Sequence, residues 1–103
     1  MTKFLASEDY APNAYVEIVL EHLQDRGLDH LRVRRHADLL VIESGPTKDS
    51  YKHARLRRVT KHLWRLEMAK PRGGWEPTPF RDLLNELLPL LTDSFGWVLT
   101  PVE

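Results

Sequence analysis

Residues 31–44, LRVRRHADLLVIES, contain the pattern that decides the fold. Apolar residues at positions 31 and 33 alternate with Arg32 and Arg34, which is the two-residue period of a strand with one apolar face. A turn near residues 37 and 38 separates this stretch from the apolar run LLVIES, which reads as a second strand. The segment therefore predicts a β-hairpin.

The alternation continues in two further segments, 53–59 and 63–68, which are joined by a turn near residues 60 and 61. Ala54 and Leu56 alternate with arginines in the first segment, and Trp64, Leu66 and Met68 alternate with other residues in the second. Gly, Pro, Asp and Ser follow one another closely in residues 45–50, a composition typical of a surface loop. We expect an antiparallel sheet of about four strands.

One helix is expected before these strands in the sequence and another after them. Val16, Val19, Leu20 and Leu23 lie at helical spacing, in a helix that begins near Pro12 and stops at Gly27. A second helix is predicted to begin with Thr78 as N-cap and Pro79 in the first turn, and to kink or end at Pro89. Its expected apolar stripe is Phe80, Leu83, Leu84, Leu87 and Leu88.

Residues 95–100 read as a last short edge strand that is closed by Pro101. The predicted fold class is therefore α+β: a two-layer domain with a helix, an antiparallel sheet of about four strands, a helix and a short C-terminal edge strand. Both helices would cover one face of the sheet. The length of 103 residues fits a single domain over 1–103.

Composition excludes several classes of chemistry. The chain has no cysteine, so it forms no disulfide and no thiolate metal site, and we expect neither metal nor cofactor. The first ten residues are too short and too charged for a secretory signal. No apolar run approaches the roughly 20 residues of a membrane span, so we expect no membrane partner and a cytoplasmic location.

Charge is distributed very unevenly although the formal net charge is zero. Residues 32–72 hold 12 Lys or Arg against 4 Asp or Glu, and the rest of the chain holds 3 against 11. A basic surface of this kind attracts an anionic partner even when the total charge vanishes. The central strands are therefore the expected binding region.

By alternation, the face of the sheet away from the helices would carry Arg32, Arg34, Arg55, Arg57 and Arg65. The second strand is apolar on both sides, so its register leaves open whether residues 39 and 41 or residues 40 and 42 share this face. Guanidinium groups match phosphate or carboxylate oxygens, and Tyr51 and Trp75 add aromatic surface. The simplest alternative is that the arginines only solubilise an exposed sheet.

We expect a small, non-enzymatic binding or regulatory module that recognises an acidic protein through its arginine-rich sheet face. Small size and charge polarity motivate the hypothesis of an antitoxin-, immunity- or adaptor-like role in a bacterium. Self-association into a homodimer is a further expectation. The alternative is an RNA- or DNA-binding domain that uses the same basic face.

A second alternative is a small nuclease, since His36, His53, Lys61, His62, Arg55 and Tyr51 are residue types used for acid–base and phosphate chemistry. The element order also resembles the core of the PD-(D/E)xK nucleases, with Asp38, Glu67 and Lys70 in the corresponding places. The spacing from Glu67 to Lys70 is one residue longer than that motif requires. We assign no catalytic residue and no metal ligand.

Overall fold

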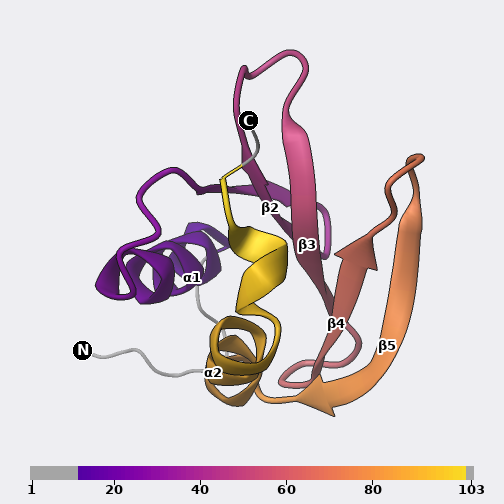
Figure 1. The fold of residues 1–103 in the computed structure, drawn as a ribbon. Helices are drawn as coiled ribbons and strands as arrows, with labels where there is room; N and C mark the ends of the chain where they lie inside the picture. Colours follow the sequence, from indigo (N-terminus) through magenta and orange to yellow (C-terminus); the bar gives the residue numbers. More distant parts are fainter. Residues whose placement is uncertain (1–11, 102–103) are drawn as a thin grey trace.

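The computed structural model describes residues 12–101. Within this range two α-helices and a short 3₁₀ helix lie on one side of a five-stranded antiparallel sheet with the strand order β1-β2-β3-β4-β5 (Figure 1). The elements are α1 (Pro12–Asp25), β1 (Arg32–His36), β2 (Leu39–Ser44), β3 (Tyr51–Arg58), β4 (Trp64–Ala69), β5 (Trp75–Asp82), α2 (Leu84–Ser94) and the 3₁₀ helix η2 (Gly96–Leu99). The predicted α+β class is confirmed, and the expected number of about four strands is corrected to five.

Helix α1 ends as its sequence predicts. Gly27 has a φ of 76°, and the amide of Leu28 donates to the carbonyl of Leu23 at 3.0 Å, the bond that closes a glycine-terminated helix. Val19 and Leu23 are fully buried and Val16 packs against the core. Leu20 of the predicted stripe is only half-buried, whereas Tyr15, outside that stripe, belongs to the core. Burial of this stripe fixes α1 against the strands.

The first four strands form where the alternation predicts them. Val33 pairs with Ile42 and Ile42 with Ala54, and these side chains point toward the helices. Trp64, which the alternation places on the same side, is 3% exposed. The helix-facing core of the sheet is completed by Leu40, Leu56 and Leu66.

Residues 75–82 form β5, whereas the sequence predicts that a helix begins at Thr78. Pro77 pairs with Glu67 and Arg81 with Arg65, so the segment extends the sheet. Prolines fit because β5 is an edge strand, where a missing amide donor costs little. The hydroxyl of Thr78, the predicted N-cap, donates to the carbonyl of Leu66 at 2.7 Å instead of capping a helix.

Helix α2 begins later and ends later than predicted. It starts at Leu84 and continues through Pro89 to Ser94. Phe80 and Leu83, expected in its apolar stripe, are 37% and 47% exposed, while Leu91, which lies beyond the predicted kink or end at Pro89, is fully buried. Burial of four leucines offsets the backbone hydrogen bond that proline removes, so the helix persists.

The predicted edge strand at residues 95–100 is also wrong. The segment forms η2, in which the amide of Val98 donates to the carbonyl of Phe95 at 2.9 Å. Leu99 is fully buried in the core, and η2 lies on the helix side of the sheet, next to β3. No helix in residues 12–101 is long and apolar enough to cross a membrane.

Candidate binding face and pocket

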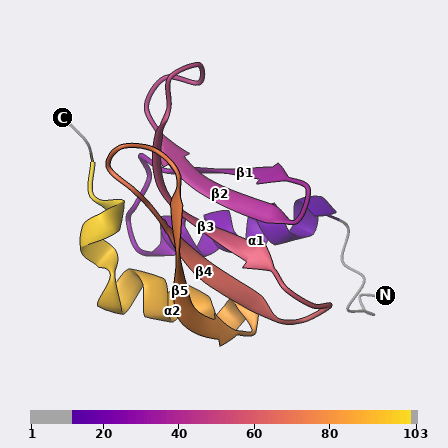
Figure 2. The same ribbon diagram turned by 90° about the vertical axis from the view of Figure 1, so that its right-hand side faces the viewer.

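One face of the sheet is left uncovered by the helices, and we call it the open face. Figure 2 looks toward it, with α1 behind the strands. Strand register decides the open question of β2, because Val41 pairs with Arg34 and Arg55 and therefore shares their side of the sheet. The charged residues of this face are Arg32, Arg34, Lys52, Arg55, Arg57, Arg65 and Arg81 together with Glu43 and Glu67. All five predicted arginines lie on it.

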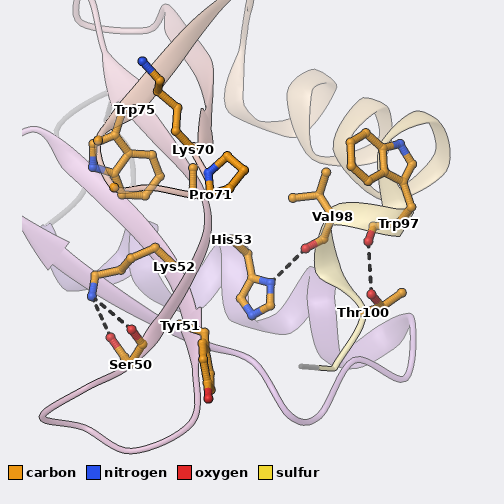
Figure 3. A pocket seen from close by; sticks show the side chains of 13 residues that line it. Ser50, Tyr51, Lys52, His53, Lys70, Pro71, Trp75, Trp97, Val98 and Thr100 are labelled. Carbon is orange, nitrogen blue, oxygen red and sulfur yellow. Dashed lines mark hydrogen bonds between the residues drawn. The ribbon is translucent and has the colours of Figure 1, made fainter. Parts of the chain in front are cut away.

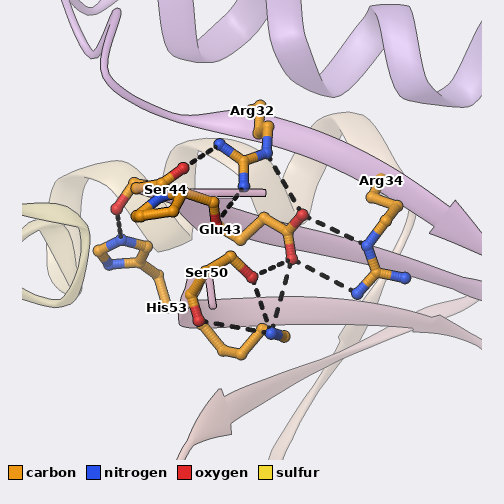
Figure 4. A network of polar contacts seen from close by, with 9 residues as sticks. Arg32, Arg34, Glu43, Ser44, Ser50 and His53 are labelled. Carbon is orange, nitrogen blue, oxygen red and sulfur yellow. Dashed lines mark hydrogen bonds and ion pairs between the residues drawn. The ribbon is translucent and has the colours of Figure 1, made fainter. Parts of the chain in front are cut away.

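Glu43 binds the cations at one end of the open face (Figure 4). Its side chain is 3% exposed, and its carboxylate accepts from Nε and Nη2 of Arg34 at 3.3 and 3.4 Å. Nε of Arg32 lies at 3.4 Å and Nζ of Lys52 at 3.9 Å. The hydroxyl of Ser50 donates to the same carboxylate at 3.0 Å. One carboxylate thereby orders three cationic side chains.

Glu67 has the same role in the middle of the sheet. Its carboxylate accepts from Nε of Arg55 at 2.6 Å and from Nε of Arg57 at 3.1 Å. Arg65 donates through Nε and Nη2 at 3.2 and 2.8 Å. Because these contacts come from β3 and β4, they connect adjacent strands through side chains as well as through the backbone.

Both carboxylates stay ionised at neutral pH. Burial by itself raises the pKa of Glu67, but hydrogen bonds from Arg55, Arg65 and Arg57 outweigh it and leave this pKa below the ordinary value of 4.5. Burial likewise acts against the charge of Glu43, and hydrogen bonds from Arg34 and Ser50 lower its pKa below 4.5. The two clusters are therefore salt-bridge networks with a net positive charge.

The lowered pKa values predict that the protein loses stability in acid. A carboxylate with a depressed folded-state pKa stabilises the fold above its unfolded pKa, and this contribution is lost as pH falls through the folded value. We expect the urea midpoint to drop as pH falls below about 4.5, and Glu43→Gln to reduce the slope of that drop. If the urea midpoint falls equally steeply with pH in Glu43→Gln and in the unmodified protein, the lowered pKa of Glu43 does not contribute to stability.

The arginine side chains also explain why β2 is buried on both faces. Val41 is 4% exposed although it lies on the open face. Arg34 and Arg55 pair with it on the two neighbouring strands, so their side chains flank it on the same face of the sheet. The open face is thus an apolar strand and two carboxylates lying under a layer of cations.

A pocket of about 500 Å³ adjoins one end of the open face (Figure 3). Tyr51 and Trp75, both predicted as binding residues, line it. Trp97, which sequence reasoning did not select, lies on its rim with 72% of its surface exposed. No signal in the sequence indicates that Trp97 lines a pocket, because residues 95–100 are predicted as an edge strand and form a 3₁₀ helix instead. The remaining principal lining residues are Lys52, His53, Lys70, Pro71, Val98 and Thr100.

His53 lies at the base of this pocket and is 4% exposed. Its Nε2 is 2.8 Å from the hydroxyl of Ser44, and its Nδ1 is 2.8 Å from the carbonyl oxygen of Val98. His30 contacts the next carbonyl, that of Leu99, through Nε2 at 2.7 Å. His53 therefore attaches η2 to β3, His30 attaches it to the α1–β1 connection, and both nitrogens of His53 have structural partners.

The residues of the possible nuclease site do not gather in one place. His53 and Tyr51 line the pocket beside η2, whereas Lys61 and His62 line a separate cavity of about 370 Å³ with Tyr15 and Trp64. Glu67, the carboxylate in the PD-(D/E)xK comparison, is bound by three arginines. Within residues 12–101, no three His, Asp or Glu side chains are arranged to hold a metal ion.

Comparisons with known proteins add no family to these observations. The sequence matches no protein-family model, and searches among curated proteins and among solved structures found no significant match. The functional argument therefore depends on the open face and the pocket.

Proposed function

We propose that this protein is a small, non-enzymatic binding module whose open face binds the phosphate backbone of nucleic acid. The observation that carries the proposal is the layering of charge. The two carboxylates are each 3% exposed, whereas the side chains of Arg34, Lys52 and Arg57 are 47%, 40% and 38% exposed. A ligand that approaches this face meets cations, which favours a polyanion.

The orientation of the guanidinium groups supports phosphate as the anion. Arg57 donates to Glu67 through Nε and its side chain is 38% exposed, so its terminal nitrogens are available to a second acceptor, whereas Arg55, which also donates through Nε, is 14% exposed and mainly supports the cluster. Holding an arginine in place before the ligand arrives reduces the entropy lost on binding. Phosphate oxygens match the fork geometry of such groups.

Aromatic surface beside these cations also supports nucleic acid over other polyanions. The guanidinium of Arg55 lies over the ring of Trp75 at 4.4 Å from its centroid. Tyr51 is 48% exposed at the start of β3, and it lines the adjoining pocket together with Lys52 and Trp75. Alternation of aromatic rings and cations is typical of surfaces that hold bases and phosphates together.

The direct test replaces two exposed arginines by neutral residues. In Arg34→Gln/Arg57→Gln, each carboxylate keeps two cationic partners, so the fold is preserved. We expect affinity for labelled oligonucleotides to fall about tenfold, and the magnitude of the slope of log affinity against log salt to fall by about 1 to 2. Fluorescence anisotropy between about 50 and about 200 mM salt measures both quantities.

A matched control removes the same charge from the helix side of the molecule. Arg35 lies next to Arg34 in β1 but pairs with Leu40, and Arg26 lies just past α1 beside Thr92. Arg26→Gln/Arg35→Gln should leave affinity and salt slope unchanged. Failure of the unmodified protein to bind RNA, single-stranded DNA and duplex DNA at low salt would overturn the proposal, as would equal losses in both double variants.

An acidic protein partner, in an antitoxin, immunity or adaptor role, is the second candidate. It is favoured by the mixture of ordered arginines with Leu39 and Trp75 on one face, since arginine and tryptophan are enriched at the energetic centres of interfaces. Purification of the tagged protein from its native host after nuclease treatment distinguishes an acidic protein partner from a nucleic-acid ligand. A protein that co-purifies in stoichiometric amount with Arg26→Gln/Arg35→Gln but not with Arg34→Gln/Arg57→Gln would establish this candidate. The same experiment would detect self-association if the co-purifying protein is a second copy of this chain.

A further inference from the structure

The pocket beside the open face has exposed rings that the fold itself does not require. Trp97 is 72% exposed and Tyr51 is 48% exposed, although both are large aromatic residues. Their hydrophobic surfaces are left in water on opposite sides of the pocket (Figure 3). Clustered exposed aromatic residues indicate a binding site more often than isolated ones do.

Each ring is attached to a fixed part of the structure. An added Cβ at Gly45 would come within 2.9 Å of the Tyr51 ring, so this ring packs directly on the loop backbone. Trp75 lies under the guanidinium of Arg55, and Trp97 is carried by η2, which His53 attaches to β3. Rings that are positioned before binding form stacking platforms with little entropic cost.

Cations accompany these rings. Lys52 and Lys70 line the pocket, and its described lining contains no carboxylate. Nζ of Lys52 is held by the hydroxyl of Ser50 at 2.8 Å and lies 3.9 Å from Glu43, which belongs to the open face. Lys70 is exposed in the β4–β5 turn, where Gly73 and Gly74 both have positive φ. The pocket thus offers aromatic faces together with positive charge.

The pocket and the open face form one continuous surface. Lys52 pairs with Glu43 and Trp75 pairs with Ala69, which places both on the open face, and both also line the pocket. A chain of phosphates that crosses the arginines can therefore continue into the pocket without leaving positive potential. The volume of about 500 Å³ lies in the range of sites for small organic groups.

We propose that the pocket binds an unstacked base of single-stranded nucleic acid. The base lies against the ring of Trp97 or Tyr51, the adjoining phosphates contact Lys52 and Lys70, and the rest of the strand crosses the open face. This inference rests on the proposed function and deepens it, because bases paired within a duplex do not present their flat faces to such rings. The module is thereby expected to bind single strands more tightly than duplex of equal length.

The test compares two substitutions of Trp97 that differ in stacking. Trp97→Leu keeps an apolar side chain and Trp97→Phe keeps a ring. We expect Trp97→Leu to weaken binding of a single-stranded oligonucleotide of about 15 residues roughly tenfold, and Trp97→Phe to retain most of the affinity. Duplex of equal length should bind both variants like the unmodified protein, because the arginines of the open face are intact. Tyr51→Leu and Tyr51→Phe form an independent second pair.

The outcomes separate this inference from the proposed function. Equal affinity of single strand and duplex, with no effect of Trp97→Leu or Tyr51→Leu, would overturn the pocket while leaving the open face in place. If only Arg34→Gln/Arg57→Gln loses binding to all nucleic acids, and Trp97→Leu and Tyr51→Leu bind normally, the open face is the binding site and the pocket proposal is overturned. A free mononucleotide that binds as tightly as the oligonucleotide would show a small-molecule site and would overturn the strand proposal.

Discussion

Glu67→Gln is expected to destabilise the protein by about 2 to 4 kcal/mol, because it leaves Arg55, Arg57 and Arg65 around a neutral amide in the middle of the sheet. The estimate lies toward the lower end for a broken buried ion pair, since the side chain of Arg57 is 38% exposed and water screens part of the repulsion. Urea unfolding at neutral pH, followed by tryptophan fluorescence, measures the change.

Glu76→Gln is the matched control for this variant. Glu76 pairs with Met68 on the other side of the sheet and is exposed, so its replacement should change stability by less than about 0.5 kcal/mol. Similar effects of Glu67→Gln and Glu76→Gln would mean that the arginine cluster contributes nothing to the fold. In that case Glu67 would not hold the guanidinium groups of the open face in place for a ligand.

His53→Ala is expected to cost about 2 to 4 kcal/mol and to detach η2 from the sheet. The substitution removes a buried side chain and leaves the Ser44 hydroxyl and the Val98 carbonyl without their partner. Thermal unfolding gives the stability loss. Limited proteolysis should show faster cleavage within residues 95–101, because the 3₁₀ helix loses its main polar attachment to β3.

His36→Ala controls for a general effect of losing a histidine. His36 is exposed at the end of β1, so we expect a change of less than about 0.5 kcal/mol. Unchanged proteolysis of residues 95–101 in His53→Ala would contradict the role of this imidazole. The result also bears on the pocket, since His53 forms its base and η2 carries Trp97.

The two buried glutamates explain how one surface can be both stable and strongly basic. Seven Arg or Lys side chains on a single sheet face would repel one another without counter-charges. Glu43 and Glu67 each neutralise one charge within a group of three cations, and both lie beneath the groups they bind. The fold therefore retains its cohesion while the outer layer keeps its positive potential.

Local periodicity was enough to predict a large part of this structure. Alternation in residues 31–44 predicted the first hairpin, helical spacing from Val16 to Leu23 predicted α1, and the same alternation assigned the five arginines to one face. These features are readable because a strand or helix with one buried side repeats its polarity at a fixed interval. The sequence by itself thus determined the core-facing side of β1, β3 and β4 and the position of α1, whereas only strand pairing decided which side of β2 faces the core.

Tertiary contacts decided the remainder. Thr78 and Pro79 have the local features of a helix start, but pairing with β4 makes them part of an edge strand. Pro89 has the local features of a helix end, but burial of Leu91 carries α2 past it. The ordering of arginines by Glu67 and the meeting of Tyr51, Trp75 and Trp97 around one pocket join segments far apart in the chain. Such long-range pairing and burial outweigh local preferences of about 1 to 3 kcal/mol, and a single sequence carries no periodic signal of which distant segments will meet.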